Sequence, residues 1–194
     1  MEDSVELKNR ILDETIKIFN TKGFKCTMDD IARGCGISKK TIYTVYKDKE
    51  ELFLAMVDYL FDGVKREQLK VMSDEELDVI EKIRRIMSAM PASYSDIDFS
   101  KLGELKEKFP TVYFAVKAKL ESGWESTFYL MDTAREQKLI RADADKFIVK
   151  LMFEASMEHF FQSDALKENN ISYGEALAKV VDVLIDGILN VKEA

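Results

Sequence analysis

Apolar residues recur along most of this chain at spacings of three and four, which is typical of amphipathic helices. In residues 4–22 they include Ile11, Ile16 and Phe19, and they mark one face of a helix. No segment alternates apolar and polar residues as a strand does, and no internal repeat or low-complexity segment occurs. The pattern therefore predicts an all-α fold of about nine helices.

Helix start and stop signals divide the rest of the chain. Ser73 to Glu76 and Ser172 to Glu175 have the spacing of capping boxes, and Pro110 suits the first position of a helix. Pro91 indicates a helix end followed by a loop over 91–100. The predicted later helices are about 49–72, 74–90, a short one ending near 108, 110–138, 142–164 and 172–191, with a polar linker at 167–170.

The last two of these helices are apolar on more than one side. Phe147 and Leu151 share one row with Ala155, while Val149 and Phe153 belong to another. A helix that is apolar on several faces must be covered on several sides. A second copy of the chain, packed as a two-fold four-helix interface, is the simplest cover, and a homodimer is predicted.

Two short helical segments, TMDDIAR and SKKTIYTVY, lie close together and are separated by the turn GCG. Thr27 and Ser38 are suited to cap them, and Gly34 or Gly36 allows positive φ in the turn. Ile37 and the next segment's Ile42 are expected to fill a small core. This arrangement is typical of a DNA-reading helix-turn-helix.

The helix from about Lys49 follows without a Pro- or Ser-rich linker, so we expect a rigid connection. The predicted organisation is a helix-turn-helix DNA-binding domain over 1–47, and a helical ligand-binding and dimerisation domain over 48–194.

The charge distribution is compatible with DNA binding, although the formal net charge is −7. Residues 1–52 hold ten basic and ten acidic residues, so the acidic excess lies in the rest of the chain. From Arg33 to Lys49 there are five basic residues and one acidic residue. Because salt screens exposed charges beyond about 8–10 Å, this local basic segment governs attraction to phosphate.

Several classes of protein are disfavoured. Cys26 and Cys35 are the only cysteines and His159 is the only histidine, so we expect free thiols, no metal site and no cofactor. The chain has no Gly-rich phosphate loop and no nucleophile motif, so an enzyme is not expected. It has neither a signal peptide pattern nor an apolar run of about 18 residues, and we expect a cytoplasmic protein without membrane contact.

The segment ISKKTIYTVYKDKEELF resembles the signature of TetR-family transcriptional regulators, roughly V-S-x-G-T-L-Y-x-Y-F-x-S-K-E-E-L. The opening ILDETIKIFNTKGF is similar to that family's first helix, and the resemblance is strong over about residues 7–55. Lys40, Val45 and Tyr46 depart from the usual residues, and Lys40 adds a charge on the DNA-facing side. The resemblance implies an all-helical homodimer whose first three helices bind DNA, with a C-terminal pocket whose ligand releases it.

Seven residues are candidates for DNA contact: Thr27, Lys39, Lys40, Thr41, Tyr43, Thr44 and Lys49. The resemblance favours phosphate contacts for Tyr43 and Lys49, and the start of a helix also suits Lys49 to an anion. Lys39, Lys40 and Thr44 are candidates for base edges, although both lysines could meet phosphate alone. Thr27 could serve as a cap only, and Thr41 could contact phosphate or pack inside.

Ten residues of the later helices could line an apolar, pliable pocket. They are Met87, Met90, Tyr94, Phe99, Tyr113, Trp124, Phe128, Met131, Met152 and His159. For each of them, packing in the core is the competing interpretation, and His159 could instead belong to an interface.

The sequence thus predicts a ligand-responsive regulator, a repressor that binds a palindromic operator in double-stranded DNA as a homodimer and is released by a small apolar or amphipathic effector. The alternatives are a small-molecule carrier without DNA activity and an enzyme built on a helical bundle. The basic helix that carries Tyr43 is a feature that a carrier does not require.

Overall fold

The computed structural model describes residues 4–91 and 104–190. Within these residues the chain is helical, and the only β pairing is an isolated bridge between Ile140 and Leu189. This confirms the predicted all-α class and matches the predicted helix number closely. None of the helices in the described part is long and apolar enough to cross a membrane.

Three helices and one 3-10 turn form what we call the head: α1 (Ser4–Lys22), η1 (Gly23–Lys25), α2 (Met28–Cys35) and α3 (Lys39–Tyr43). The elements that follow form what we call the body. They are α4 (Lys49–Ser73), α5 (Val79–Met87), α6 (Leu105–Lys108), α7 (Pro110–Glu121), α8 (Glu125–Glu136), α9 (Lys146–Gln162), α10 (Ala165–Glu168) and α11 (Tyr173–Asp186).

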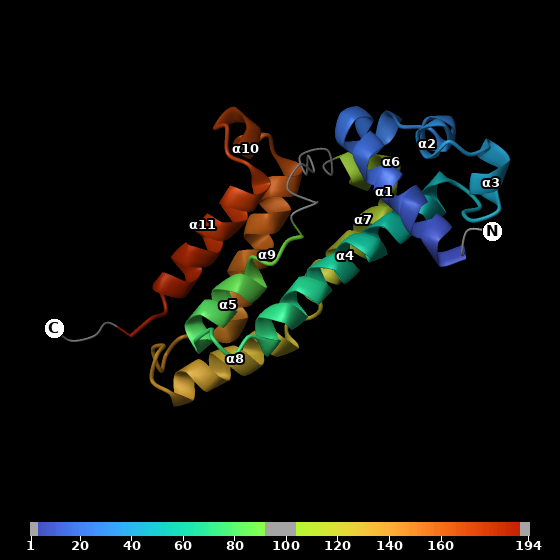
Figure 1. Cartoon of the computed structure of the whole chain (residues 1–194). Helices are drawn as coiled ribbons and strands as arrows, with labels where there is room; N and C mark the ends of the chain where they lie inside the picture. The colour runs from blue at the N-terminus through green and yellow to red at the C-terminus, as the bar shows by residue number, and fades with distance from the viewer. Residues whose placement is uncertain (1–3, 92–103, 191–194) are drawn as a thin grey trace.

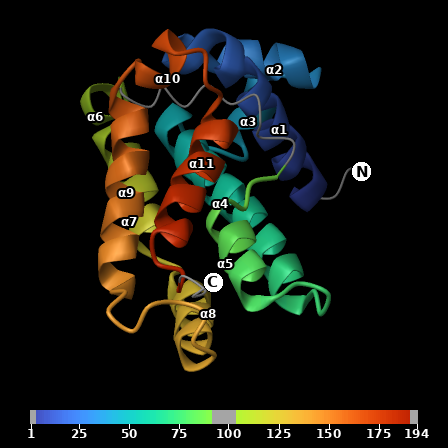
Figure 2. The same ribbon diagram turned by 90° about the vertical axis from the view of Figure 1, so that its left-hand side faces the viewer.

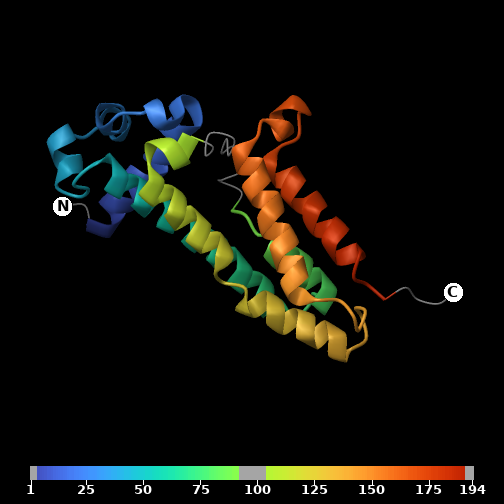
Figure 3. The same cartoon turned by 180° about the vertical axis from the view of Figure 1, so that it is seen from behind.

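Helix α4 connects the head to the far end of the body, and it does so without a break (Figure 1). Helix α7 packs along α4, while α5 packs against α8 at the far end. Helices α9 and α11 pack on each other and lie side by side away from the head, as the view from behind also shows (Figure 3). The head is therefore carried at one end of a long rigid helix.

The apolar core consists of two clusters, and the first of them runs from the head into the body. It joins Ile11, Ile31 and Ile42 of the head to Leu52 of α4 and Val112 of α7. The second cluster lies within the body, between α5, α8, α9 and α11. Burial of apolar surface thus fixes the head against the first half of α4.

The predicted helix 110–138 is two helices in the structure. Gly123 has a φ of +80°, a left-handed conformation that side-chain-bearing residues rarely adopt. Helix α7 ends at Glu121 and α8 begins at Glu125, so the chain turns at this glycine. The prediction of one continuous helix was wrong because no proline marks the break.

The predicted capping box at Ser73 to Glu76 was also wrong. Ser73 is the last residue of α4, and its hydroxyl donates to the carbonyl oxygen of Lys70 at 3.0 Å. The next helix begins after Asp78, whose carboxylate accepts from the backbone N–H of Glu81 at 2.9 Å. Asp78, and not Ser73, is therefore the N-cap of α5.

The ends of the last helices differ from the prediction by several residues. Helix α9 begins after Asp145, which accepts hydrogen bonds from two backbone N–H groups. The short helix α10 (Ala165–Glu168) overlaps the first half of the polar linker predicted at 167–170. The capping box of Ser172 and Glu175 is confirmed. Helix α11 ends at Asp186 rather than near 191, because the following residues hydrogen-bond to the segment before α9, including Asn190 N to Leu139 O at 3.0 Å.

Candidate nucleic-acid interface and ligand cavity

The turn between α2 and α3 has the geometry of a helix-turn-helix. Gly36 takes a φ of +66° and ends α2, and the N–H of Ile37 donates to the carbonyl oxygen of Ala32 at 3.0 Å. Ser38 then caps α3 by accepting from the N–H of Thr41 at 3.0 Å. Ile42, which is fully buried, holds α3 on the head core. These features confirm the predicted turn and cap.

Four predicted contact residues lie exposed on α3 and the turn that follows it: Lys39, Lys40, Tyr43 and Thr44. The aromatic side chain of Tyr43 is 45% exposed, which is unusual for a ring that only packs in a core. Lys39 forms an exposed ion pair with Asp29 of α2 at 3.2 Å. Lys40 makes no ion pair within the described residues, so its ammonium is available to another anion.

The Thr44 hydroxyl donates to the carbonyl oxygen of Thr41 at 2.7 Å, and the other two threonines on this side are hydrogen-bonded too. The hydroxyl of Thr27 accepts from the N–H of Asp30 at 3.1 Å and donates to its carboxylate at 2.9 Å. The hydroxyl of Thr41 lies 2.8 Å from that of Ser38. Both side chains therefore stabilise helix starts within the protein itself.

Asp30 completes the capping box and also accepts from Lys22 at 2.6 Å. These hydrogen bonds, first that from the Lys22 ammonium and then those from Thr27, lower the pKa of the Asp30 carboxyl to about 2. The carboxylate form is thus favoured by every donor around it.

Lys49 lies at the first position of α4, but its side chain turns inward. Its Nζ donates to the carbonyl oxygen of Phe24 at 2.6 Å and lies 5.2 Å and 5.4 Å from the ring centroids of Phe53 and Phe109. Phe53 is one helical turn along α4 and shares a face with Lys49. The ammonium is therefore occupied inside the protein, whereas the sequence predicted a position facing phosphate.

Cys26 and Cys35 form no disulfide in the structure. Burial raises the pKa of the Cys26 thiol above its ordinary value. No group of three or more metal-ligating side chains occurs among the described residues.

The body contains a large cavity of about 410 Å³ beside α4. Its walls are mostly apolar and come from the head, α4, α5, α7, α8, α9 and α11. On α4 the lining extends from Phe53 to Met72, which corresponds to about 28 Å of helix. This volume lies within the usual range of roughly 300–1,000 Å³ for small-molecule sites.

Three of the ten predicted pocket residues, Met87, Met90 and Trp124, line this cavity. Met131 is fully buried in the second core cluster, and Phe128 packs its ring against those of Trp124 and Phe147. Met152 and His159 lie exposed on α9. Tyr113 lines a smaller pocket, and Tyr94 and Phe99 lie outside the described residues.

Many residues of the cavity wall were not among the predicted candidates. Phe53, Met56 and Leu60 of α4 and Tyr173 of α11 all line it. Apolar residues occupy a broader arc of α4 than one packing face requires, and this width was a usable signal. Burial raises the pKa of the Tyr173 phenol, whose hydroxyl donates to the sulfur of Met157 at 3.2 Å.

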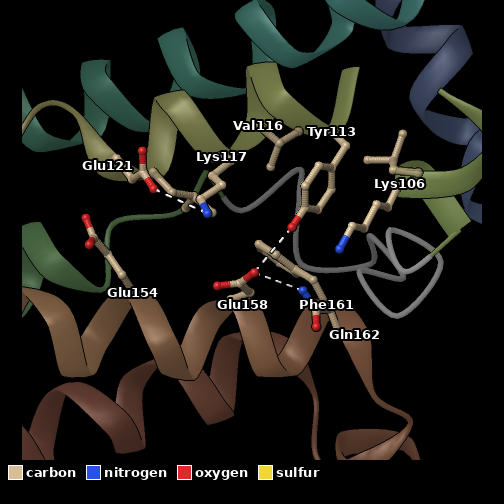
Figure 4. Close-up of a pocket in the computed structure, with 11 residues that line it drawn as sticks. Lys106, Tyr113, Val116, Lys117, Glu121, Glu154, Glu158, Phe161 and Gln162 are labelled. Carbon is tan, nitrogen blue, oxygen red and sulfur yellow. Dashed lines mark hydrogen bonds and ion pairs between the residues drawn. The ribbon is translucent and has the colours of Figure 1, made fainter. Parts of the chain in front are cut away.

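A smaller pocket lies between α7 and α9 (Figure 4). Here Glu158 accepts from the Tyr113 hydroxyl at 3.2 Å and from the Gln162 amide at 2.9 Å. Lys117 and Glu121, one turn apart on α7, form an ion pair at 3.7 Å at its rim. At about 70 Å³ this pocket holds on the order of two waters, so the large cavity is the better ligand site.

A second surface of the body is apolar and exposed. Phe147, Ile148, Leu151 and Met152 of α9 and Val183 of α11 are all more than half exposed. In the view along this side, α9 and α11 lie in front of the other helices (Figure 2). Such a contiguous apolar face is typical of a protein–protein interface.

Comparison with known proteins agrees with this geometry. Residues 11–56 match the family described as bacterial regulatory proteins, tetR family. The uncharacterized HTH-type transcriptional regulator YvaF of Bacillus subtilis (strain 168) is 29% identical over 189 residues, which are 97% of this chain and 98% of that protein.

Two further proteins are similar to the head or to the fold. The biofilm operon icaADBC HTH-type negative transcriptional regulator IcaR of Staphylococcus epidermidis is 35% identical over 57 residues, 29% of this chain and 31% of IcaR. The crystal structure of the TetR-like regulator LfrR from Mycobacterium smegmatis, in complex with proflavine, has a TM-score of 0.61 at 14% identity, covering 95% of this chain and 98% of that one.

These relatives are transcriptional regulators and not enzymes. The head thus matches the tetR family, the whole chain is similar to an HTH-type transcriptional regulator, and its fold is that of a TetR-like regulator.

Proposed function

We propose that the protein is a ligand-responsive repressor that binds a palindromic operator as a homodimer and is released by a small apolar or amphipathic effector. The observation that carries the proposal is that α4 serves two sites. It supports the head that presents α3, and it forms one wall of the 410 Å³ cavity. Because the helix is continuous, a change at the cavity can alter the position of the head.

In this proposal the exposed residues of α3 meet the major groove. Lys39, Lys40 and Thr44 contact base edges or phosphates, and Tyr43 contacts phosphate through its hydroxyl. Thr27 and Thr41 stabilise the helix starts beside the DNA backbone. The head over 1–47 thus acts as the DNA-binding domain, and the part over 48–194 acts as the ligand-binding and dimerisation domain.

The exposed apolar surfaces of α9 and α11 support a homodimer. Two copies that cover these faces would form a four-helix interface and remove the large side chains from water. The two heads could then meet successive major grooves about 34–36 Å apart, as a palindromic site requires.

The wall of the cavity supports an apolar or amphipathic effector, since its interior is lined by Met and aromatic side chains. Charged residues, among them Asp62 and Lys65, line its exposed parts. The negative regulator IcaR, which is similar over the head, supports the repressor role, and the proflavine complex of LfrR supports ligand binding. We place this activity in the cytoplasm, where a bacterial operator is accessible.

Selection of duplexes from a random-sequence library by the purified protein tests the proposal. We expect enrichment of a palindrome, and we expect Lys40→Ala to weaken its binding by about tenfold, from the loss of one contact in each protomer. Lys167→Ala, which removes an exposed lysine of α10 far along the chain, is the matched control. Equal retention of every sequence would refute an operator-specific function.

A further inference from the structure

The inward position of Lys49 points to a regulatory contact in the junction between head and body. We propose that the Lys49 ammonium is held in an aromatic cage that withdraws it from DNA, and that the cavity controls this cage. The inference rests on the proposed function and specifies how the cavity regulates DNA binding. Through the family resemblance, Lys49 is expected at a phosphate, and one ammonium cannot occupy both positions.

The cage is assembled from three separate segments. Phe24 of the head supplies the carbonyl oxygen at 2.6 Å, Phe53 belongs to α4, and Phe109 directly precedes α7 in the body. The ring centroids of these phenylalanines lie 5.1 to 5.6 Å from one another. Because Phe109 comes from the body, the cage forms only while head and body keep this relative position.

The same rings connect the cage to the ligand cavity. Phe24 and Phe53 line the cavity, together with Phe19, whose ring packs edge to face on both. An effector that fills this end would press the rings into their present arrangement and keep Lys49 caged. DNA would favour the opposite state, in which the ammonium leaves the cage for a phosphate. By linkage, each ligand then weakens the binding of the other.

The two states differ in a quantity that needs no effector to measure. Each phosphate neutralised by a cation adds about 0.9 to the slope of log affinity against log salt concentration. Lys49 at a phosphate in both protomers of the DNA complex should therefore account for close to two of this slope. Loss of the cage should leave the slope unchanged and tighten binding by at least about twofold per protomer, since the cation–π contact no longer competes.

The experiment compares Phe109→Leu with Phe109→Tyr on a duplex selected by the wild type, over 50–200 mM salt. Leucine removes the ring face and tyrosine keeps it, at a half-buried site where both are apolar enough to pack. We expect Phe109→Leu to bind more tightly with the slope of the wild type, and Phe109→Tyr to behave as the wild type. Lys49→Gln should give a shallower slope, and the double variant should match Lys49→Gln.

An unchanged affinity in Phe109→Leu, measured with a wild type that binds the duplex, overturns the cage as a regulatory contact and leaves the proposed function intact. A slope that is the same in Lys49→Gln and the wild type also overturns it, because Lys49 then never reaches phosphate. A wild type that retains no duplex refutes the proposed function and this inference together.

Discussion

At the scale of single residues, Asp30 shows how one carboxylate organises the start of α2. It accepts from Lys22 and from both the backbone and the hydroxyl of Thr27. These donors hold its pKa at about 2, below the value of about 3.9 of an unfolded chain. A group with a lowered pKa in the folded state stabilises the fold above its unfolded pKa, and this contribution is lost as the pH falls through the folded pKa.

We therefore expect Asp30→Asn to lower the urea midpoint of unfolding at pH 6. The difference from the wild type should shrink as the pH falls from about 4 towards 2, because the wild-type carboxyl then becomes neutral. Urea titrations at several pH values measure this. Glu75→Gln, in the exposed turn after α4, is the control and should leave the pH 6 midpoint unchanged. A difference that stays constant down to pH 2.5 would contradict this account of Asp30.

Residue chemistry made much of the head predictable. Thr27 and Ser38 were expected to cap helices, and each accepts from the backbone N–H three residues later. The exposed side of α3 was predicted as the set of positions that remain once the apolar positions are assigned to the core. The direction of the Lys49 side chain was not predictable, because it depends on Phe109, which is sixty residues further along the chain.

At the scale of helices, the largest difference from the sequence prediction is the break between α7 and α8. The apolar periodicity continues across it, and local patterns do not report whether a glycine is left-handed. Gly123 is left-handed, and a Cβ at this position would meet no other atom within 4 Å. Any effect of a substitution there should therefore come from backbone strain alone.

Replacement of Gly123 by alanine should destabilise the protein by about 1 kcal/mol. Urea unfolding measures this loss. The matched control is Gly174→Ala in the first turn of α11, where a Cβ also meets nothing within 4 Å and the backbone is not left-handed. Alanine favours helix over glycine, so the control should be neutral or up to about 1 kcal/mol more stable. Equal losses in both variants would argue against strain at Gly123.

At the scale of the whole molecule, the exposed apolar face of α9 and α11 is the feature that is hardest to explain for a monomer, which would leave it in water. Leu151 is 58% exposed in the middle of this face. We expect Leu151→Glu to place two carboxylates in the proposed interface and shift the protein towards the 22.3 kDa monomer. Sedimentation equilibrium measures the mass, and operator binding should weaken with it.

Tyr129→Glu provides the control for this change. Tyr129 is 64% exposed on α8, outside the proposed interface, so its replacement should leave the mass unchanged. A wild type that sediments as a monomer at micromolar concentration would contradict the homodimer. Retention of the dimer by Leu151→Glu would instead place the interface elsewhere.

The cavity was the part of the molecule that the sequence predicted least well. Met and aromatic residues were expected to line it, but the same residue types also fill the core and cover the exposed face. Met87, Met131 and Met152 illustrate this, since they lie at the cavity, in the core and on the surface respectively. Which of the three holds for a given methionine depends on how the helices assemble.

The head supplies part of the cavity wall through Ile16, Phe19 and Phe24. Exchanging residues 1–47 with those of a relative would thus transplant a portion of the small-molecule chamber along with the DNA-reading surface. Chimaeras of this kind should have a ligand specificity that combines those of both parent proteins. Ligand specificity and DNA specificity therefore cannot change independently of each other.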